Sequence, residues 1–297
     1  MKKILALLLV LVMAFSLVAC TSTAPKTDPT PDLIVDQVEE TPELVPDETP
    51  EVKEPVEIIV FAAASMKETL EAIGAVYEDA NPHVTLVFNF DSSGTLKTQI
   101  AEGADCDVFI SAAQRQMNEL DIEADAAINV DGLDIVMQGT RINLLENKVA
   151  LAVPEGNPAG LESYDMLMEL LESGEITLAI GNSDVPVGQY TEKIFEYYEI
   201  DMASVEKNLT FGSNVKEVTT HVSESLVSCG IIYATDAVSA GLQIVDTATA
   251  EMCGQVIYPA AVLNTTESAD EAEAFLAFLL TAEAETIFDS VGFTVVK

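Results

Sequence analysis

Short apolar runs rich in β-branched residues alternate along this chain with segments in which apolar residues recur at helical spacing. The apolar runs predict strands at 57–62, 84–89, 107–111, 148–153, 177–180, 230–233, 243–246 and 257–263. The segments between them predict amphipathic helices at 66–79, 161–173, 189–199, 215–228 and 270–288. Strands that alternate with helices are typical of α/β architecture with mostly parallel sheets. In such sheets, ligands gather at the carboxyl ends of the strands, so those ends are the places to look for a site.

The first twenty residues follow a different pattern. Lys2 and Lys3 precede an apolar run at 4–18, which is short for a membrane-spanning helix but fits the apolar region of a signal peptide. The run ends at Leu17-Val18-Ala19-Cys20, which resembles a bacterial lipobox. We therefore expect residues 1–19 to be a lipoprotein signal peptide and Cys20 to carry the lipid, including an acyl chain such as palmitate. An uncleaved membrane anchor is the alternative interpretation.

Proline and acidic residues dominate the next stretch. Residues 21–57 hold seven of the twelve prolines and eleven Asp or Glu, with no glycine and no aromatic residue. This composition cannot bury a core, so residues 20–56 are expected to be a lipidated cysteine followed by a disordered acidic tether. A specific acidic docking segment is the alternative.

Composition narrows the classes of partner. The formal net charge of −37 leaves no basic face for nucleic acid, while 49% hydrophobic residues support a sizeable core. Beyond Cys20, the cysteines Cys106, Cys229 and Cys253 show no metal-ligand spacing, and only two histidines are present. One cysteine pair can be bridged or all three can be free thiols. We expect no cofactor and no direct bond from protein to a metal cation.

Three strand-to-helix junctions carry hydroxyl groups. Ser65 follows the first strand, and with Glu68 it can form a capping box, which would explain it structurally. Ser93 lies in a Ser-Ser-Gly turn whose N–H groups can hold an anion or simply begin a helix. Tyr233 ends a buried strand, where its phenol can donate a hydrogen bond without carrying charge.

These segments together resemble the molybdate-binding proteins of ABC importers, over nearly all of residues 57–297. The landmarks are Phe61-Ala62-Ala63-Ala64-Ser65, Ser92-Ser93-Gly94-Thr95-Leu96, Asp107-Val108-Phe109-Ile110-Ser111-Ala112, Val185-Pro186-Val187-Gly188-Gln189-Tyr190, Gly230-Ile231-Ile232-Tyr233 and Gly292-Phe293-Thr294. The resemblance implies the two-lobed type II periplasmic-binding-protein fold, with each lobe a mostly parallel sheet flanked by helices and the ligand in the cleft between lobes. It places lobe 1 at 57–139 and 240–297 and lobe 2 at 140–239, closing around the ligand by hinge motion.

The resemblance also implies a ligand site. Ser65 and Ser93 would donate from the first lobe, and the backbone N–H groups of Val187 and Val215 and the hydroxyl of Tyr233 would donate from the second. The ligand would be molybdate or tungstate, held through its oxygens without Lys or Arg. The protein would be an extracytoplasmic monomer, anchored to the cell membrane only by its lipid, that delivers the oxyanion to an ABC importer permease.

Two residues depart from the family pattern in ways that affect this site. Val187 stands where many relatives have a smaller residue, and it can narrow the cleft. Asp91 directly precedes the Ser-Ser-Gly turn, and its carboxylate would repel a dianion unless it points to solvent.

The sequence leaves other functions as alternatives. Ser213 and Lys216 match the SxxK pattern of serine acyl enzymes, but the companion Ser-Asp-Asn and Lys-Thr-Gly motifs are absent, so we expect no enzyme activity. A binding protein of the same fold for sulfate, phosphate or an organic anion remains the main alternative. A surface adhesion module would need a large apolar patch, which 6% aromatic residues and no Trp do not favour.

Overall fold

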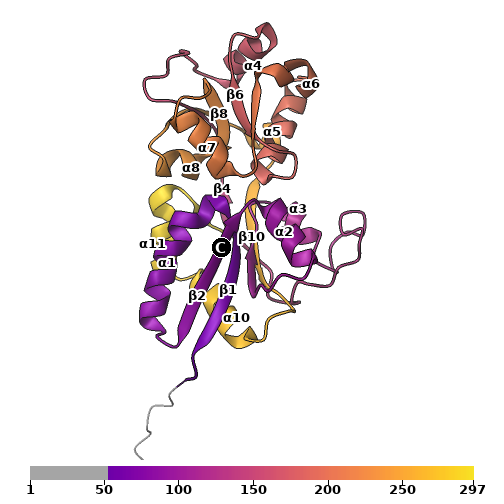
Figure 1. Ribbon diagram of the computed structural model, residues 1–297, viewed down its shortest axis with the longest axis vertical. Helices are drawn as coiled ribbons and strands as arrows, with labels where there is room; N and C mark the ends of the chain where they lie inside the picture. The colour runs from indigo at the N-terminus through magenta and orange to yellow at the C-terminus, as the bar shows by residue number, and fades with distance from the viewer. Residues whose placement is uncertain (1–52) are drawn as a thin grey trace, which may run out of the picture. The chain divides into compact units, whose positions relative to one another are not determined.

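The computed structural model describes residues 53–297. The expected signal peptide, the lipid attachment site Cys20 and nearly all of the expected tether lie outside this part of the chain. Within residues 53–297, no helix has the length and apolar character needed to cross a membrane. Two β-sheets, each flanked by helices, build this region (Figure 1).

The first lobe is built on a six-stranded sheet of order β11-β4-β10-β3-β1-β2. Its strands are β1 (Val56–Ala63), β2 (Val84–Asp91), β3 (Val108–Ile110), β4 (Ile142–Asn147), β10 (Val256–Val262) and β11 (Thr294–Val295). Its helices are η1 (Ala64–Met66), α1 (Lys67–Ala80), α2 (Ser93–Ala101), α3 (Gln114–Asn118), α10 (Ala269–Phe278) and α11 (Ala282–Val291). Helices cover both faces of this sheet, because β1 alternates between two apolar cores: Ile58 and Val60 pack into one, and Phe61 into the other.

The second lobe is built on a five-stranded sheet of order β7-β6-β8-β5-β9. Its strands are β5 (Val149–Val153), β6 (Leu178–Gly181), β7 (Leu209–Gly212), β8 (Cys229–Tyr233) and β9 (Gln243–Thr247). Its helices are α4 (Tyr164–Ser173), α5 (Pro186–Tyr197), α6 (Met202–Val205), η2 (Glu206–Asn208), α7 (Val215–Ser223), α8 (Ala234–Ser239) and α9 (Ala250–Cys253). The ends of these helices follow local signals: Ser163 caps the start of α4, and Gly174 ends it with a left-handed backbone.

Both sheets are mixed, which corrects the expectation of mostly parallel sheets. In the first sheet, β1 pairs in parallel with β2 and β3, but β10 runs antiparallel to β3 and β4. In the second sheet, β6 is parallel to β7 and β8, but β5 is antiparallel to β8 and β9. The chain passes between the sheets from β4 to β5 and from β9 to β10, and all four of these strands have antiparallel partners.

The chain crosses between the sheets at two places. β4 ends at Asn147 in the first sheet and β5 begins at Val149 in the second, and the return lies between β9 and β10. Sheet membership therefore places both crossings several residues after the expected boundaries at 139/140 and 239/240.

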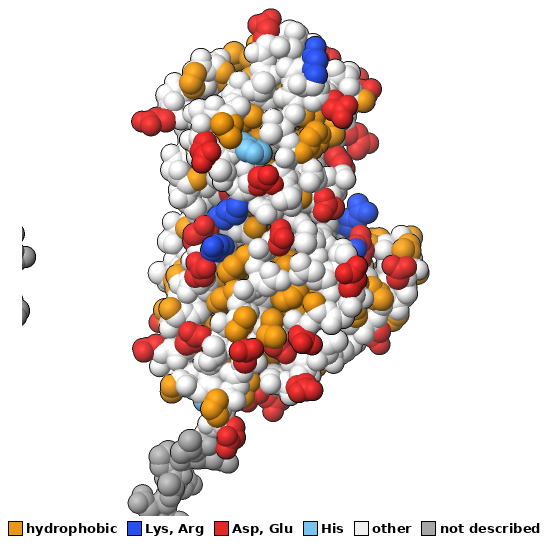
Figure 2. Space-filling view, in the orientation of Figure 1, with side chains coloured by type: hydrophobic (Ala, Val, Ile, Leu, Met, Phe, Trp, Pro, Cys, Tyr) orange, Lys and Arg blue, Asp and Glu red, His pale blue; other side chains and the backbone are white. Residues whose placement is uncertain are grey.

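Most predicted elements are present, with differences that have local causes. The eight predicted strands are all found, whereas β4, β7 and β11 were not predicted. The single helix expected at 270–288 is two helices, because α10 ends before Thr281, whose side chain caps α11. On the face shown in Figure 2, acidic side chains are spread over both lobes, and most of the basic side chains lie near the junction of the lobes.

Candidate functional site

The five residues predicted to bind the ligand line one pocket between the two lobes. Ser65 and Ser93 come from the first lobe, and Val187, Val215 and Tyr233 from the second. The remaining lining residues are Ala63, Ala64, Asp91, Ser92, Ala112, Val185 and Pro186, none of which is Lys or Arg. The cavity volume is about 10 Å³, far below the roughly 300–1,000 Å³ typical of pockets for drug-sized ligands. The pocket therefore suits a small ion.

Ser65 does not cap a helix, which corrects the capping-box interpretation. It lies in the single 3-10 turn η1 after β1, and its hydroxyl lies 2.9 Å from the hydroxyl of Tyr258. Glu68, the other half of the expected box, forms an ion pair with Lys216 instead. The Ser65 hydroxyl is thus left to serve the pocket.

Ser93 is the first residue of α2, and its neighbour Ser92 caps that helix by accepting a hydrogen bond from the N–H of Thr95 at 3.1 Å. Because Ser92 provides the cap, Ser93 is free for another contact. Its Oγ accepts a hydrogen bond from the N–H of Ala112 at 2.9 Å, and the side chain is fully buried.

Val187 and Val215 occupy the first turns of α5 and α7. Pro186 begins α5, and Asn214 caps α7 by accepting from the N–H of Glu217 at 3.1 Å. The N–H groups of a helix's first turn have no acceptor within the helix, so those of Val187 and Val215 remain available to a ligand. Together with α2, three helices direct their positive dipole ends at this pocket, which favours an anion.

Tyr233 is the only residue of β8 that lines the pocket among the described residues, and its hydroxyl is buried without a hydrogen-bond partner in the protein. Burial raises the pKa of this phenol well above its usual value of 10. The phenol therefore stays protonated and can donate a hydrogen bond at neutral pH.

Asp91 also lines the pocket, so its carboxylate is not directed wholly to solvent. Its Oδ1 accepts hydrogen bonds from the N–H of Ser92 at 2.7 Å and from the side-chain amide of Asn214, in the second lobe, at 3.2 Å. These donors hold the carboxylate and offset part of its charge near the pocket.

A charged cluster joins the lobes beside the pocket. Lys216 Nζ lies 2.7 Å from Glu68 Oε2 in the first lobe and 3.1 Å from Asp236 Oδ1 in the second. Burial raises the pKa of Asp236 to about 6, and Lys216 offsets only part of that rise. Burial lowers the pKa of Lys216, but the two carboxylates outweigh it and hold this pKa above its usual value.

The same contacts argue against the serine acyl enzyme. The Ser213 hydroxyl donates to Glu217 Oε2 at 2.8 Å, while the Lys216 ammonium is held by its two carboxylates. Lys216 is therefore not placed as a base for Ser213.

Close backbone approach brings the second lobe against α2. A Cβ on Gly94 would lie 2.2 Å from the carbonyl oxygen of Asp184, so only glycine fits there. Nearby, the side-chain amide of Gln116 donates to Gln189 Oε1 at 3.2 Å across the lobes.

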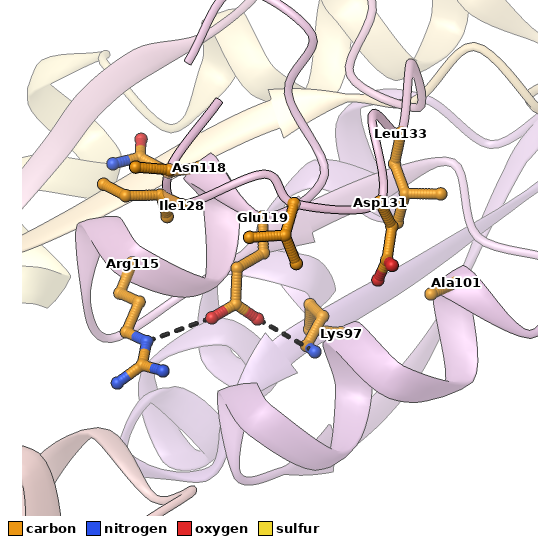
Figure 3. A pocket seen from close by; sticks show the side chains of 10 residues that line it. Lys97, Ala101, Arg115, Asn118, Glu119, Ile128, Asp131 and Leu133 are labelled. Carbon is orange, nitrogen blue, oxygen red and sulfur yellow. Dashed lines mark hydrogen bonds and ion pairs between the residues drawn. The ribbon is translucent and has the colours of Figure 1, made fainter. Parts of the chain in front are cut away.

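A wider cavity, with a volume of about 560 Å³, lies over α2 and α3 (Figure 3). None of the predicted ligand residues lines it. Its two cations, Lys97 and Arg115, both pair with Glu119, at 2.8 and 3.0 Å, so their charge is largely satisfied within the protein. The smaller pocket is the better candidate for an anion site.

Sequence reasoning missed the residues that support the serines. The hydroxyl of Tyr258 contacts Ser65, Asn147 donates to Tyr258, and the N–H of Ala112 donates to Ser93. Asn147 was visible as a lone amide between two apolar runs, but nothing local links it to Ser65. Cys106, Cys229 and Cys253 are all buried free thiols, so no pair of them forms a bridge.

Residues 58–294 match the family of bacterial extracellular solute-binding proteins. The chain is 32% identical over 240 residues to YvgL of Bacillus subtilis, covering 80% of this chain and 86% of YvgL, which is described as an ABC transporter substrate-binding lipoprotein without a named substrate. It is 29% identical to the molybdate-binding protein ModA of Haemophilus influenzae, covering 80% of this chain and 90% of ModA.

Solved structures show the same fold. The periplasmic molybdate-binding protein of Azotobacter vinelandii matches with a TM-score of 0.67 and 19% identity, covering 81% of this chain and all of that one. The sulfate-binding protein SubI of Mycobacterium tuberculosis matches with a TM-score of 0.64 and 16% identity, covering 82% of this chain and 88% of that one. Both are type II periplasmic-binding-protein folds of two α/β lobes, and fold likeness at these identities does not distinguish one oxyanion from another.

Proposed function

Because this chain belongs to the family of bacterial extracellular solute-binding proteins, we propose that it captures molybdate, and tungstate with it, and delivers the oxyanion to the permease of an ABC importer. One observation carries the proposal: three helix N-termini, two serine hydroxyls and a buried phenol line a single small pocket that contains no Lys or Arg.

Such a pocket fits a dianion. Hydrogen bonds to a charged group contribute roughly 1.5–3 kcal/mol each, so several neutral donors and helix dipoles can hold two negative charges. The lining holds no Lys or Arg, so no ion pair has to break when the ligand is released. This suits a protein that passes its ligand to a transporter.

Selectivity would come from the spacing of the donors. Sulfate has the charge and shape of molybdate but is smaller, so donors fixed for the larger ion would make long hydrogen bonds to sulfate. Unmet donors in a closed pocket are costly. Molybdate and tungstate present near-identical oxygen tetrahedra, and the donors would hold both.

We further propose that Cys20 anchors the protein outside the cytoplasm and that the acidic stretch at 20–56 lifts it from the membrane. The lipobox-like sequence and the resemblance to a substrate-binding lipoprotein support this. Metabolic labelling with a fatty acid would test it: a Cys20→Ala variant should lose the label.

A binding protein for sulfate or phosphate is the second candidate, supported by the fold it shares with SubI. Isothermal titration of the purified protein with molybdate, tungstate, sulfate and phosphate in one buffer separates the two. We expect tight one-to-one binding of molybdate and tungstate alone. Binding of only sulfate or phosphate would replace the ligand, and binding of none of the four would overturn the proposed function.

A further inference from the structure

Ser65 is one end of a chain of buried hydrogen bonds that leads away from the pocket. The hydroxyl of Tyr258 lies 2.9 Å from Ser65 Oγ, and Asn147 Nδ2 donates to that phenol at 3.2 Å and to Thr235 Oγ1 at 2.9 Å. All four side chains are at least nine-tenths buried. The chain begins at the crossing between the lobes, because Asn147 is the last residue of β4.

The direction of each hydrogen bond in this chain follows from counting protons. The N–H of Lys148 donates to Asn147 Oδ1 at 2.8 Å, which fixes the orientation of the amide. Its nitrogen then has two protons, one for Thr235 and one for Tyr258, so the phenol oxygen of Tyr258 acts as an acceptor.

The ring of Tyr233 packs against Tyr258, but its hydroxyl has no partner within hydrogen-bond distance. The single proton of Tyr258 therefore has one remaining partner among the described residues, the Oγ of Ser65. If Ser65 donated instead, this buried phenol proton would have no acceptor, at a cost of roughly 1–3 kcal/mol. Burial also raises the pKa of Tyr258 well above its usual value of 10, so the proton stays on the phenol. Tyr258 therefore donates to Ser65.

We propose that Tyr258 and Asn147 are positioning residues. They orient the Ser65 hydroxyl so that it donates its proton toward the pocket and does not accept a hydrogen bond there. The oxygen of Ser65 is occupied by Tyr258, so its own proton is free to point at a ligand. The inference rests on the proposed oxyanion site and explains why a hydroxyl, which can donate or accept, behaves there as a donor.

The Ser93 hydroxyl is also oriented as a donor toward the pocket, but by a backbone group. The N–H of Ala112 can only donate, so it occupies the Oγ of Ser93 and leaves the Ser93 proton for the pocket. Both serines are thus oriented as donors, one by the backbone and one by side chains. Only the arrangement at Ser65 can be altered by substitution without moving the backbone.

Titration of the intact protein with sodium molybdate tests the proposal through Tyr258→Phe. Removing the phenol hydroxyl frees the Ser65 oxygen and lets its proton turn away, so we expect affinity to fall about tenfold. In a Ser65→Ala background the same substitution should cause no further loss. A structural role for Tyr258 would instead lower affinity by the same factor in both backgrounds.

A second variant, Asn147→Asp, reverses the direction of these hydrogen bonds and keeps the size and shape of the side chain. A carboxylate cannot donate, so Tyr258 would donate to it and Ser65 would have to donate to Tyr258. The new carboxylate repels a dianion in either background, so we expect affinity to fall about tenfold more in the wild-type background than in the Ser65→Ala background. If Tyr258→Phe fails to fold, this variant tests the proposal in its place.

Tyr164→Phe is the matched control, because Tyr164 is equally buried, its hydroxyl has no partner in the described residues, and it does not line the pocket. It should leave affinity unchanged. Wild-type affinity in Tyr258→Phe, or equal losses with and without Ser65, would overturn the inference. If the wild type binds only sulfate or phosphate, that ion becomes the probe; if it binds none of the four oxyanions, the proposed function fails and the inference with it.

Discussion

Ser65 and Ser93 reach the pocket from different local structures, a 3-10 turn and the first turn of an α-helix. Neither hydroxyl caps a helix, because η1 has no side-chain cap and Ser92 caps α2. Their removal leaves the helix caps intact, but it takes the acceptor from the buried Ala112 N–H or Tyr258 hydroxyl, so each should also cost roughly 1–3 kcal/mol of stability.

The serine hydroxyls give the first prediction. Ser65→Ala and Ser93→Ala should each weaken molybdate binding by about tenfold or more, the value of one hydrogen bond to a charged group. Titration calorimetry measures the affinity, and a thermal melt checks that each variant folds. Ser173→Ala, at an exposed serine in α4, is the control and should bind normally. Unchanged affinity in both pocket variants would remove these serines from the site.

Tyr233 gives a prediction with two readouts of opposite sign. Its hydroxyl is buried without a partner in the protein, which is costly in the ligand-free state. Tyr233→Phe should therefore weaken molybdate binding about tenfold while the melting temperature without ligand stays equal or rises. A variant that melts lower without ligand but binds as tightly would show that the hydroxyl is structural.

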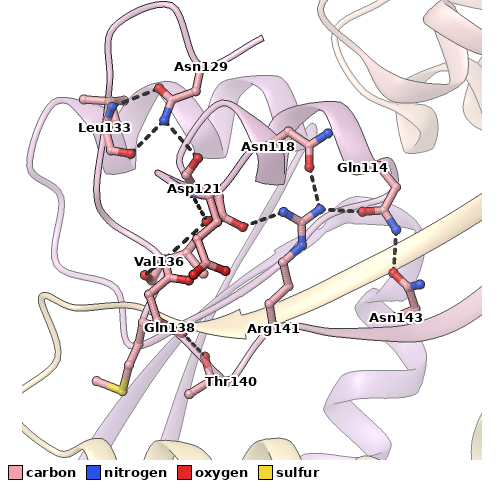
Figure 4. A network of polar contacts seen from close by, with 12 residues as sticks. Gln114, Asn118, Asp121, Asn129, Leu133, Val136, Gln138, Thr140, Arg141 and Asn143 are labelled. Atoms are coloured by element: carbon pink, nitrogen blue, oxygen red, sulfur yellow. Dashed lines mark hydrogen bonds and ion pairs between the residues drawn. The ribbon is translucent and has the colours of Figure 1, made fainter. Parts of the chain in front are cut away.

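At the scale of elements, an arginine organises the segment between α3 and β4. Arg141 donates to Asp121 Oδ2 at 2.6 Å, to Gln114 Oε1 at 2.6 Å and to Asn118 Oδ1 at 2.5 Å (Figure 4). Burial raises the pKa of Asp121, but the hydrogen bonds from Arg141 and others outweigh it, so the pKa lies below its usual value of 3.8. This ion pair fastens the loop after α3 to the start of β4.

The lowered pKa of Asp121 fixes the sign of a pH dependence. A carboxyl group with a lowered pKa stabilises the folded state above its usual pKa, and that contribution is lost as the pH falls through the folded-state pKa. Asp121→Asn should thus reduce the free energy of unfolding by about 2 kcal/mol at neutral pH. The difference from wild type should shrink below pH 3.8.

Urea unfolding at several pH values measures this difference. Asp134→Asn, at an exposed carboxylate in the same segment, should show little effect at any pH. A difference between Asp121→Asn and wild type that does not change with pH would mean that the Arg141 ion pair is not its source.

At the scale of the whole described region, contacts across the lobes hold the pocket closed. The Glu68–Lys216 ion pair joins α1 of the first lobe to α7 of the second, so separating the lobes would break it. Both side chains are partly exposed, which limits such a pair to about 0.5 kcal/mol and makes it sensitive to salt.

Glu68→Gln should therefore weaken molybdate binding about twofold at low ionic strength, with a faster dissociation rate, and the difference should vanish in 1 M salt. Stopped-flow dissociation and titration at two salt concentrations measure this. Glu71→Gln, on the same helix and 4.0 Å from Lys67 only, is the matched control. An equal effect in both variants would mean that the change in net charge, and not the loss of the Glu68–Lys216 ion pair, weakens binding.

The sequence alone determined the alternation of strands and helices, because hydrophobic periodicity depends on neighbouring residues. β1, α1, α5 and β8 are found close to their predicted ranges, and the hydroxyl-bearing junctions that follow β1 and β2 and end β8 were visible there. The resemblance to a known family supplied what local pattern did not, namely that these junctions belong to one site.

Only the tertiary structure decided how these pieces meet. Strand direction and the true crossings depend on pairing between residues far apart in the chain, as between β4 and β10, so no local pattern revealed them. The same holds for Tyr258, which reaches Ser65 across 193 positions of sequence. A serine's local sequence allows either a cap or a ligand role, and for Ser65 the local pattern favoured the cap. Contacts with residues far away in the chain, such as that with Tyr258, are what select between the two roles.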